Sequence, residues 1–170
     1  MPAPLTEPIT AICMTEELKK YEATIPTKHS FNWTPTFEEE FHTPLNQKVF
    51  VPIALKAFEQ LGWDPVYQDD TTAEAKRKGD WGRWTQKIAV VYDRGRVTVK
   101  SVSLGNEMWD NGANSKRVRL FIYAFQRTEK EFDKEALVTL EQEVDAANNW
   151  DDYEVPDSLP APKKRSAPQL

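Results

Sequence analysis

Trp81 and Trp84 flank the pair Gly82-Arg83, and together they form the most unusual cluster of side chains in the sequence. Aromatic rings in such a cluster can stack on a base, a sugar or a proline, while an arginine binds an anion. The alternative is a connection between strands whose tryptophans close the open end of a hydrophobic core. Trp109, just before a predicted turn, has the same two interpretations.

Basic residues gather in the middle of the chain. Residues 76–130 contain 13 Lys and Arg against 5 Asp and Glu, a net charge of +8, whereas residues 1–75 carry −7 and residues 131–170 carry −6. If these cations converge, they form an anion-binding surface. The candidate ligand- or partner-binding residues are Trp81, Arg83, Trp84, Lys87, Arg94, Arg96, Lys100, Trp109, Lys116 and Arg119.

An acidic partner within the chain explains the basic residues equally well. Lys116, Arg117 and Arg119 lie at the start of a predicted helix, where positive charge opposes the helix dipole. Acidic side chains from the first 75 residues or from the last predicted helix would offset that repulsion. The sequence leaves open whether the basic surface faces an internal or an external partner.

Patterns typical of catalysis are missing from the sequence. The six glycines are not spaced as in a phosphate-binding loop, and no Gly-x-Ser-x-Gly elbow is present. Cys13 is the only cysteine, so neither a disulfide within the chain nor a thiolate zinc site is expected. His29 and His42 lack a ligand partner at helical spacing, and Glu38–Glu40 favours a solvated acidic turn over a metal site. We therefore expect no cofactor, no metal and, on balance, no enzyme.

Three longer helices are predicted, and they would hold the basic residues in place. Residues 51–61 have apolar side chains at three- and four-residue spacing, with Pro52 expected in the first turn and Gly62 just past the end. A second helix is expected to begin near Asn114 or Ser115 as its N-cap and to continue to about residue 129. A third covers residues 134–147, capped by Asp133, and a short helix starts after Thr15.

Four strands are predicted at residues 66–68, 72–76, 87–92 and 97–104, the last two joined by a short glycine-containing hairpin. Val97, Val99 and Ser101 face one way and their neighbours face the other, so one side of the sheet is expected to be wet. The fold class is α+β: a roughly four-stranded antiparallel sheet with two or three helices packed on one face. The aromatic-rich segment 31–41 is expected to pack on that core.

The sequence predicts one domain with two tails. Residues 1–30 are expected to form a partly mobile arm, residues 31–147 a single α+β domain, and residues 148–170 a disordered, acidic and Pro-rich tail. Trp150 and Tyr153 lie in an aromatic-acidic cluster of that tail, and we expect them to dock. The lone cysteine and the lack of a signal peptide or long apolar stretch predict a cytoplasmic protein without membrane insertion.

The order of several short motifs resembles an uncharacterised bacterial domain. That domain occurs in small cytoplasmic proteins and in soluble parts of rhomboid-like and other multidomain proteins. The motifs span about residues 48–130 and are Leu61-Gly62-Trp63, Trp81-Gly82, Val97-Thr98-Val99-Lys100-Ser101 and Trp109-Asp110-Asn111-Gly112. The resemblance implies an α+β fold and no known activity.

A non-catalytic binding or interaction module is the function that these features favour. The expected partner of its basic, tryptophan-bearing surface is an acidic protein segment, including the chain's own tail, or an anionic ligand. Nucleic acid is disfavoured because the chain as a whole is acidic, with a net charge of −5. The alternative is a small-ligand carrier or small enzyme with a pocket between sheet and helices, lined by Trp63, Trp81, Trp84 and Tyr92.

Overall fold

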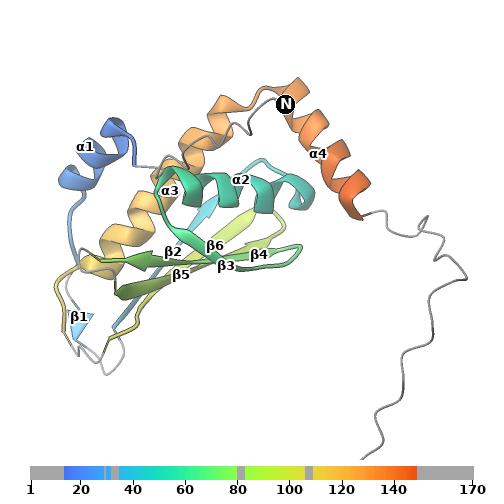
Figure 1. Ribbon diagram of the computed structural model, residues 1–170. Coiled ribbons are helices and arrows are strands. Elements are labelled where there is room, and N and C mark those ends of the chain that lie inside the picture. Colours follow the sequence, from blue (N-terminus) through green and yellow to red (C-terminus); the bar gives the residue numbers. More distant parts are fainter. Residues whose placement is uncertain (1–13, 29, 32–34, 80–82, 106–108, 149–170) are drawn as a thin grey trace, which may run out of the picture.

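The computed structural model describes residues 14–28, 30–31, 35–79, 83–105 and 109–148. Its main sheet has five antiparallel strands in the order β2-β6-β5-β4-β3, and helices cover one side of it (Figure 1). The strands are β2 (Thr36–His42), β3 (Asp64–Gln68), β4 (Thr72–Lys78), β5 (Trp84–Asp93) and β6 (Arg96–Ser103), with a separate small pair formed by β1 (Ser30–Phe31) and β7 (Trp109–Asp110). The helices are α1 (Glu16–Thr24), α2 (Gln47–Gln60), α3 (Ala113–Glu131) and α4 (Lys134–Asn148).

The α+β class and the antiparallel sheet predicted from the sequence are confirmed, but the main sheet has five strands rather than four. The missed strand is β2, which pairs with β6 along its whole length, from Thr36 opposite Val102 to His42 opposite Arg96. Its run Glu38–Glu40 disguises the alternation of a strand. Such charges suit β2 because it lies at the edge of the sheet, where they discourage pairing with another chain.

The two faces of the sheet differ as the alternation of β5 and β6 predicts. Ile88, Val90, Val97 and Val99 are fully buried on the inner face, under α2 and α3. Phe121 of α3 belongs to the same core. At about 25 cal/mol per Å² of apolar surface removed from water, this face supplies the main stabilisation of the fold.

Helix α2 begins earlier than the sequence predicts. Asn46 caps it by accepting a hydrogen bond from the Val49 amide, so Pro52 lies inside the helix rather than in its first turn. The helix tolerates Pro52 because neighbouring side chains, Phe50 and Ile53 among them, are fully buried. Its end is as expected: Gly62 has a φ of 66°, the left-handed conformation that follows many helices.

Helix α3 also starts one or two residues before its predicted cap. Gly112 takes the cap position with a φ of 84°, and a Cβ there would lie 2.4 Å from the Thr27 side chain, so only glycine fits. Asn114 instead turns inward and is fully buried. Its side-chain amide donates to the Pro35 carbonyl and accepts from the Ser101 hydroxyl, which ties the helix to the sheet.

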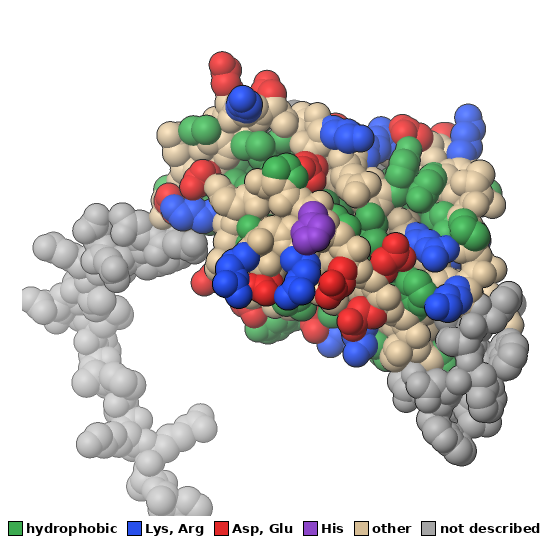
Figure 2. Space-filling model, turned by 180° about the vertical axis from the view of Figure 1, so that it is seen from behind, with side chains coloured by type: hydrophobic (Ala, Val, Ile, Leu, Met, Phe, Trp, Pro, Cys, Tyr) green, Lys and Arg blue, Asp and Glu red, His purple; other side chains and the backbone are tan. Residues whose placement is uncertain are grey.

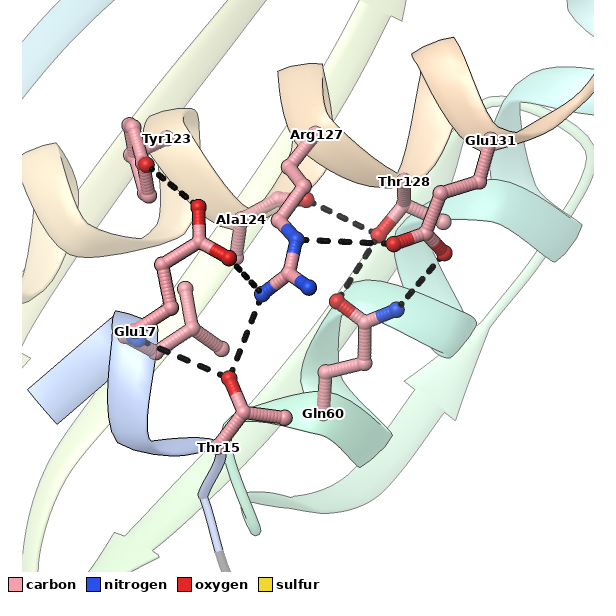
Figure 3. A network of polar contacts seen from close by, with 9 residues as sticks. Thr15, Glu17, Gln60, Tyr123, Ala124, Arg127, Thr128 and Glu131 are labelled. Carbon is pink, nitrogen blue, oxygen red and sulfur yellow. Dashed lines mark hydrogen bonds and ion pairs between the residues drawn. The ribbon is translucent and has the colours of Figure 1, made fainter.

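Helix α1 packs on α3 through a polar network (Figure 3). The Arg127 guanidinium lies 3.1 Å from the Glu17 carboxylate and donates to the Thr15 hydroxyl at 3.2 Å. Tyr123 donates to Glu17 at 3.0 Å, and Arg127 also pairs with Glu131 in its own helix. The predicted cap is confirmed as well, since the Thr15 hydroxyl accepts from the Leu18 amide.

Helix α4 is separate from α3, a point that the sequence left undecided. The chain turns at Phe132 and Asp133, and the Asp133 carboxylate accepts from the Ala136 amide at 2.7 Å, as a cap does. The helix then packs on α2 rather than on the sheet. No helix in the described part of the chain combines the length and apolarity required to cross a membrane.

Candidate binding surface

The outer face of the sheet carries most of the predicted basic residues of β4, β5 and β6. None of the described helices packs on this face, because α2 and α3 both lie on the opposite one (Figure 1). The strand register arranges its side chains in rows across the sheet. One row runs from Glu38 through Lys100 and Ala89 to Glu74 and Tyr67. Charges of opposite sign therefore alternate along the row.

Acidic side chains pair with the basic residues of this face. Lys100 lies 4.0 Å from Glu38, and Lys87 lies 2.6 Å from Glu74. By register and alternation the strands present five cations and five carboxylates on the described outer face, so the formal charge of these strand residues is zero. These are Lys76, Lys78, Lys87, Arg96, Lys100, Glu38, Glu40, Asp64, Glu74 and Asp93.

Arg117 and Arg119 of α3 are paired with carboxylates in the same way, but on the helical side of the molecule. Arg119 pairs with Glu39 at 3.3 Å and donates to the Pro26 carbonyl, while Arg117 pairs with Glu22 of α1. The internal acidic partner that the sequence allowed is thus present, and it comes from the first 75 residues. Viewed from behind, the molecule shows basic and acidic side chains interspersed rather than separated by sign (Figure 2).

One end of the outer face departs from this balance. We define the Trp84 corner as Lys76, Lys78, Arg83 and Trp84, next to Asp64 of β3. The Trp84 side chain is 40% exposed, and the Lys78 ammonium lies 4.7 Å from the centre of its ring, a cation–π contact. Lys78 also approaches Asp64 at 3.8 Å, whereas Lys76 and Arg83 form no ion pair with a described residue. Counting described residues alone, three cations and one carboxylate give the corner a formal charge of +2.

A β-bulge places Trp84 on the outer face. The register shifts between Arg77 and Lys78, so Trp84 pairs with Lys78 instead of continuing the alternation of Gln86 and Ile88. Gly79 closes the turn beyond the bulge by donating its amide to the Arg83 carbonyl at 2.8 Å. A Cβ on Gly79 would lie 2.8 Å from a Thr85 methyl group, so a side chain there would disturb the corner.

The structure brings some predicted site residues together and separates others. Arg83, Trp84 and Lys87 lie toward one end of β5, while Arg94 and Arg96 pair with Asp93 at the hairpin, the opposite end of the strand. Ten residues of β5 separate the two ends by roughly 30 Å. Lys116 and Arg119 lie on α3, on the other side of the sheet. Trp81, Trp150, Tyr153 and the Trp109 side chain lie outside the described residues.

Two residues predicted to line a pocket between sheet and helices are used for packing. Trp63 is almost completely buried, with its ring 6.1 Å from that of Phe58. Tyr92 packs on Phe50 at 5.1 Å and donates its hydroxyl to the Leu45 carbonyl. Among the described residues, no three His, Cys, Asp or Glu side chains gather as a metal site requires, and His42 lies exposed at the end of β2.

A comparison of the sequence with protein-family models and with curated proteins finds no match. The resemblance to an uncharacterised bacterial domain therefore stays a prediction. Within the site, the contact of the Lys78 ammonium with the Trp84 ring is a feature that the sequence did not predict. Its signal is weak in the sequence, because the two residues become neighbours only through the bulge between β4 and β5.

Proposed function

We propose that this protein is a non-catalytic binding module that engages an acidic protein segment through the Trp84 corner and the adjoining outer face. The observation that carries the proposal is the exposed Trp84 ring beneath the Lys78 ammonium, beside two cations, Lys76 and Arg83, that form no ion pair within the described chain. A carboxylate-bearing partner would pair with Lys76 and Arg83 without displacing an ion pair between described residues. Its aromatic or proline side chains would stack on the indole.

The size of the outer face favours an extended segment over a folded partner. Five strands about 4.8 Å apart and about seven residues long define a plane on the order of 500 Å². A stable complex of two folded proteins buries about 800 Å² on each partner. A peptide that crosses the strands needs less area, and the exposed Tyr67 and Val91 give it apolar contacts beyond the corner.

One segment of this chain has the acidic and aromatic side chains expected of the partner. The tail carries Trp150 and Tyr153 on either side of Asp151-Asp152, which combines aromatic rings with negative charge. We include this segment among the acidic partners of the corner, and the same chemistry in another chain would serve equally well. Docking of the tail within its own chain and capture of a second chain differ in their dependence on protein concentration.

A peptide titration tests the proposal. The probe is a fluorescent peptide with the sequence Asn-Trp-Asp-Asp-Tyr-Glu-Val-Pro, added to the full chain carrying D151N and D152N so that the internal copy is weakened. The double variant K76E/R83E should raise the dissociation constant about tenfold, which corresponds to about 1.4 kcal/mol. Higher salt should weaken binding, because exposed charges are screened.

The matched control reverses two exposed lysines on helices remote from the corner, K20E/K134E. It changes the net charge of the chain by the same amount, so equal weakening by both double variants would leave only a general charge effect. Binding that is indifferent to salt would remove the electrostatic basis of the proposal. A W84A variant separates the contribution of stacking from that of charge pairing, since it deletes the stacking surface and keeps every charge.

A further inference from the structure

A groove of about 770 Å³ lies on the other side of the molecule, between the first half of α2, the β3–β4 turn and the last half of α4. Figure 1 shows the end of α4 beside the start of α2, with the β3–β4 turn below them. The Lys48 ammonium of α2 lies 2.9 Å from Asp145 and 3.8 Å from Glu141, both on α4. These ion pairs bridge α2 and α4 along the groove.

The floor of the groove is apolar. It is formed by Val51, Pro52 and Leu55 of α2 together with Val144 and Ala147 of α4. Val51 is buried, whereas Leu55 and Val144 keep partial exposure and Ala147 is exposed. An occupant with small apolar side chains would therefore remove this surface from water at a gain of about 25 cal/mol per Å².

The rim of the groove is acidic. Asp69, Asp70, Glu141 and Asp145 face one cation, Lys48, so the lining has a formal charge of −3. Hydrogen bonds from the Thr71 amide and from other groups of the turn hold the pKa of Asp69 below its ordinary value, which keeps this carboxylate ionised.

Lys48 satisfies only part of that negative charge. It is shared between Glu141 and Asp145, and Asn46 donates a further hydrogen bond to Glu141 at 3.4 Å. Asp70 makes no hydrogen bond or ion pair within the described chain. The acidic rim thus fits a basic occupant, the opposite of the segment that the Trp84 corner favours.

The chain itself supplies a segment of the required chemistry. Leu159-Pro160-Ala161-Pro162 is apolar and rich in proline, and Lys163-Lys164-Arg165 follows it with a charge of +3. We propose that residues 159–165 dock in this groove within the same molecule, with the apolar part on the floor and the cations on the acidic rim. The charge of +3 on the basic triplet equals in magnitude the charge of −3 on the groove lining.

The position of the tail favours this occupant over one from another molecule. Ala147 lines the groove and α4 ends at Asn148, so the chain leaves the described region at the groove itself. Fourteen residues lie between Asn148 and Lys163, and this length of chain can span up to about 50 Å, more than the contact requires. Linkage of this kind gives an effective concentration in the millimolar range. Prolines also reduce the conformational entropy lost on docking, because they favour extended backbone.

Paramagnetic relaxation in the full chain tests the docking. A nitroxide attached to the single thiol of the variant C13S/S166C, directly after the basic triplet, should broaden the amide signals of residues 68–70 and 144–147. Reversal of the tail charges by K163E/K164E/R165E should abolish that broadening, and raising the salt to 1 M should reduce it, since the screening length then falls to about 3 Å. Broadening that survives charge reversal would overturn the proposal.

Two further comparisons identify the occupant. D70K should weaken the broadening because it reverses an unpaired rim charge, whereas E59K, on an exposed part of α2 away from the groove, should leave it unchanged. A mixture of isotope-labelled chain and separate spin-labelled chain should show no broadening. Broadening in that mixture would instead assign the groove to a second copy, and broadening confined to the outer sheet face would assign the tail to the Trp84 corner; either result overturns the proposal.

Discussion

The inner and outer faces of the sheet carry residues of the same strands, but different interactions dominate on each face. On the inner face, side chains such as Val90 and Val99 are fully buried, and their contribution follows from the apolar area they remove from water. On the outer face, Lys100 and Glu38 stay about half exposed, so their attraction is weakened by solvent. Stability should therefore depend mainly on the inner face.

The largest effect should follow from removing a buried ring. Phe121 of α3 is fully buried and lies 5.0 Å from Phe58 and 5.9 Å from Phe125, measured between ring centres. We expect F121A to lower the free energy of unfolding by about 3–5 kcal/mol through the lost burial and the cavity left behind. Urea unfolding followed by circular dichroism measures it.

Val91 of the outer face provides the matched control. It lies on the same strand as Val90 but is 42% exposed, so V91A should change the free energy of unfolding by no more than about 0.5 kcal/mol. Equal losses in F121A and V91A would break the contrast between the faces. If F121A does not fold, F121L serves in its place, with an expected loss below about 1.5 kcal/mol.

A smaller loss in the free energy of unfolding is expected when the buried Asn114, at the polar edge of the inner face, is replaced. The Asn114 amide donates to the Pro35 carbonyl and to the Ser103 hydroxyl, and it accepts from Ser101 at 2.7 Å. N114A should cost about 1–3 kcal/mol, because buried polar partners lose their hydrogen bonds. The exposed Asn111 of the preceding turn is the control, and a loss in N111A as large as that in N114A would refute the role of the buried amide.

Ion pairs on the outer face should contribute less to the free energy of unfolding than the buried hydrogen bonds of Asn114 do. A double-mutant cycle on Lys87 and Glu74, which lie 2.6 Å apart on neighbouring strands, should give a coupling energy of about 0.2–1 kcal/mol. The cycle compares K87A, E74A and the double variant in urea unfolding, and the coupling should fall in high salt. A coupling well above this range would show that the outer face supports the fold as the inner face does.

The sequence predicts the inner face far better than the outer one. Apolar spacing locates α2, α3 and the hairpin of β5 and β6 because burial enforces a strict period. It misses β2, whose Glu39 is inward-facing yet paired with Arg119 from a helix 80 residues away. Contacts of this range have no local signature.

The same reason explains why charge counts alone do not locate a basic surface. A charge of +8 in residues 76–130 predicts a basic surface only if the acidic residues lie elsewhere. The antiparallel register instead brings Glu38 beside Lys100 and Glu74 beside Lys87, leaving the Trp84 corner as the basic remnant. The sequence gives Arg83, Trp84, Arg94 and Arg96 together as candidate binding residues. Only the strand register shows that the first two lie at the opposite end of β5 from the other two.

The smallest effect is expected from a partly buried carboxyl in the helical layer. Burial raises the pKa of Glu129 above its ordinary value of 4.5, although a hydrogen bond from the Thr43 hydroxyl acts in the opposite direction. The folded state then binds the proton more readily than the unfolded state, so this carboxyl lowers the free energy of unfolding as the pH rises from the ordinary value through the raised one. E129Q removes the titration and keeps an oxygen for Thr43.

The free energy of unfolding of E129Q relative to the parent chain should therefore increase from acidic to neutral pH. Urea unfolding at several pH values above and below 4.5 measures this difference. T43V sharpens the test, because loss of the hydroxyl removes the hydrogen bond that favours the carboxylate, and the decline of stability with rising pH should become steeper. If the difference in free energy of unfolding between E129Q and the parent chain is constant with pH, burial does not raise the pKa of Glu129. A carboxyl in the helical layer would then behave like the solvent-exposed carboxyls on the outer face of the sheet.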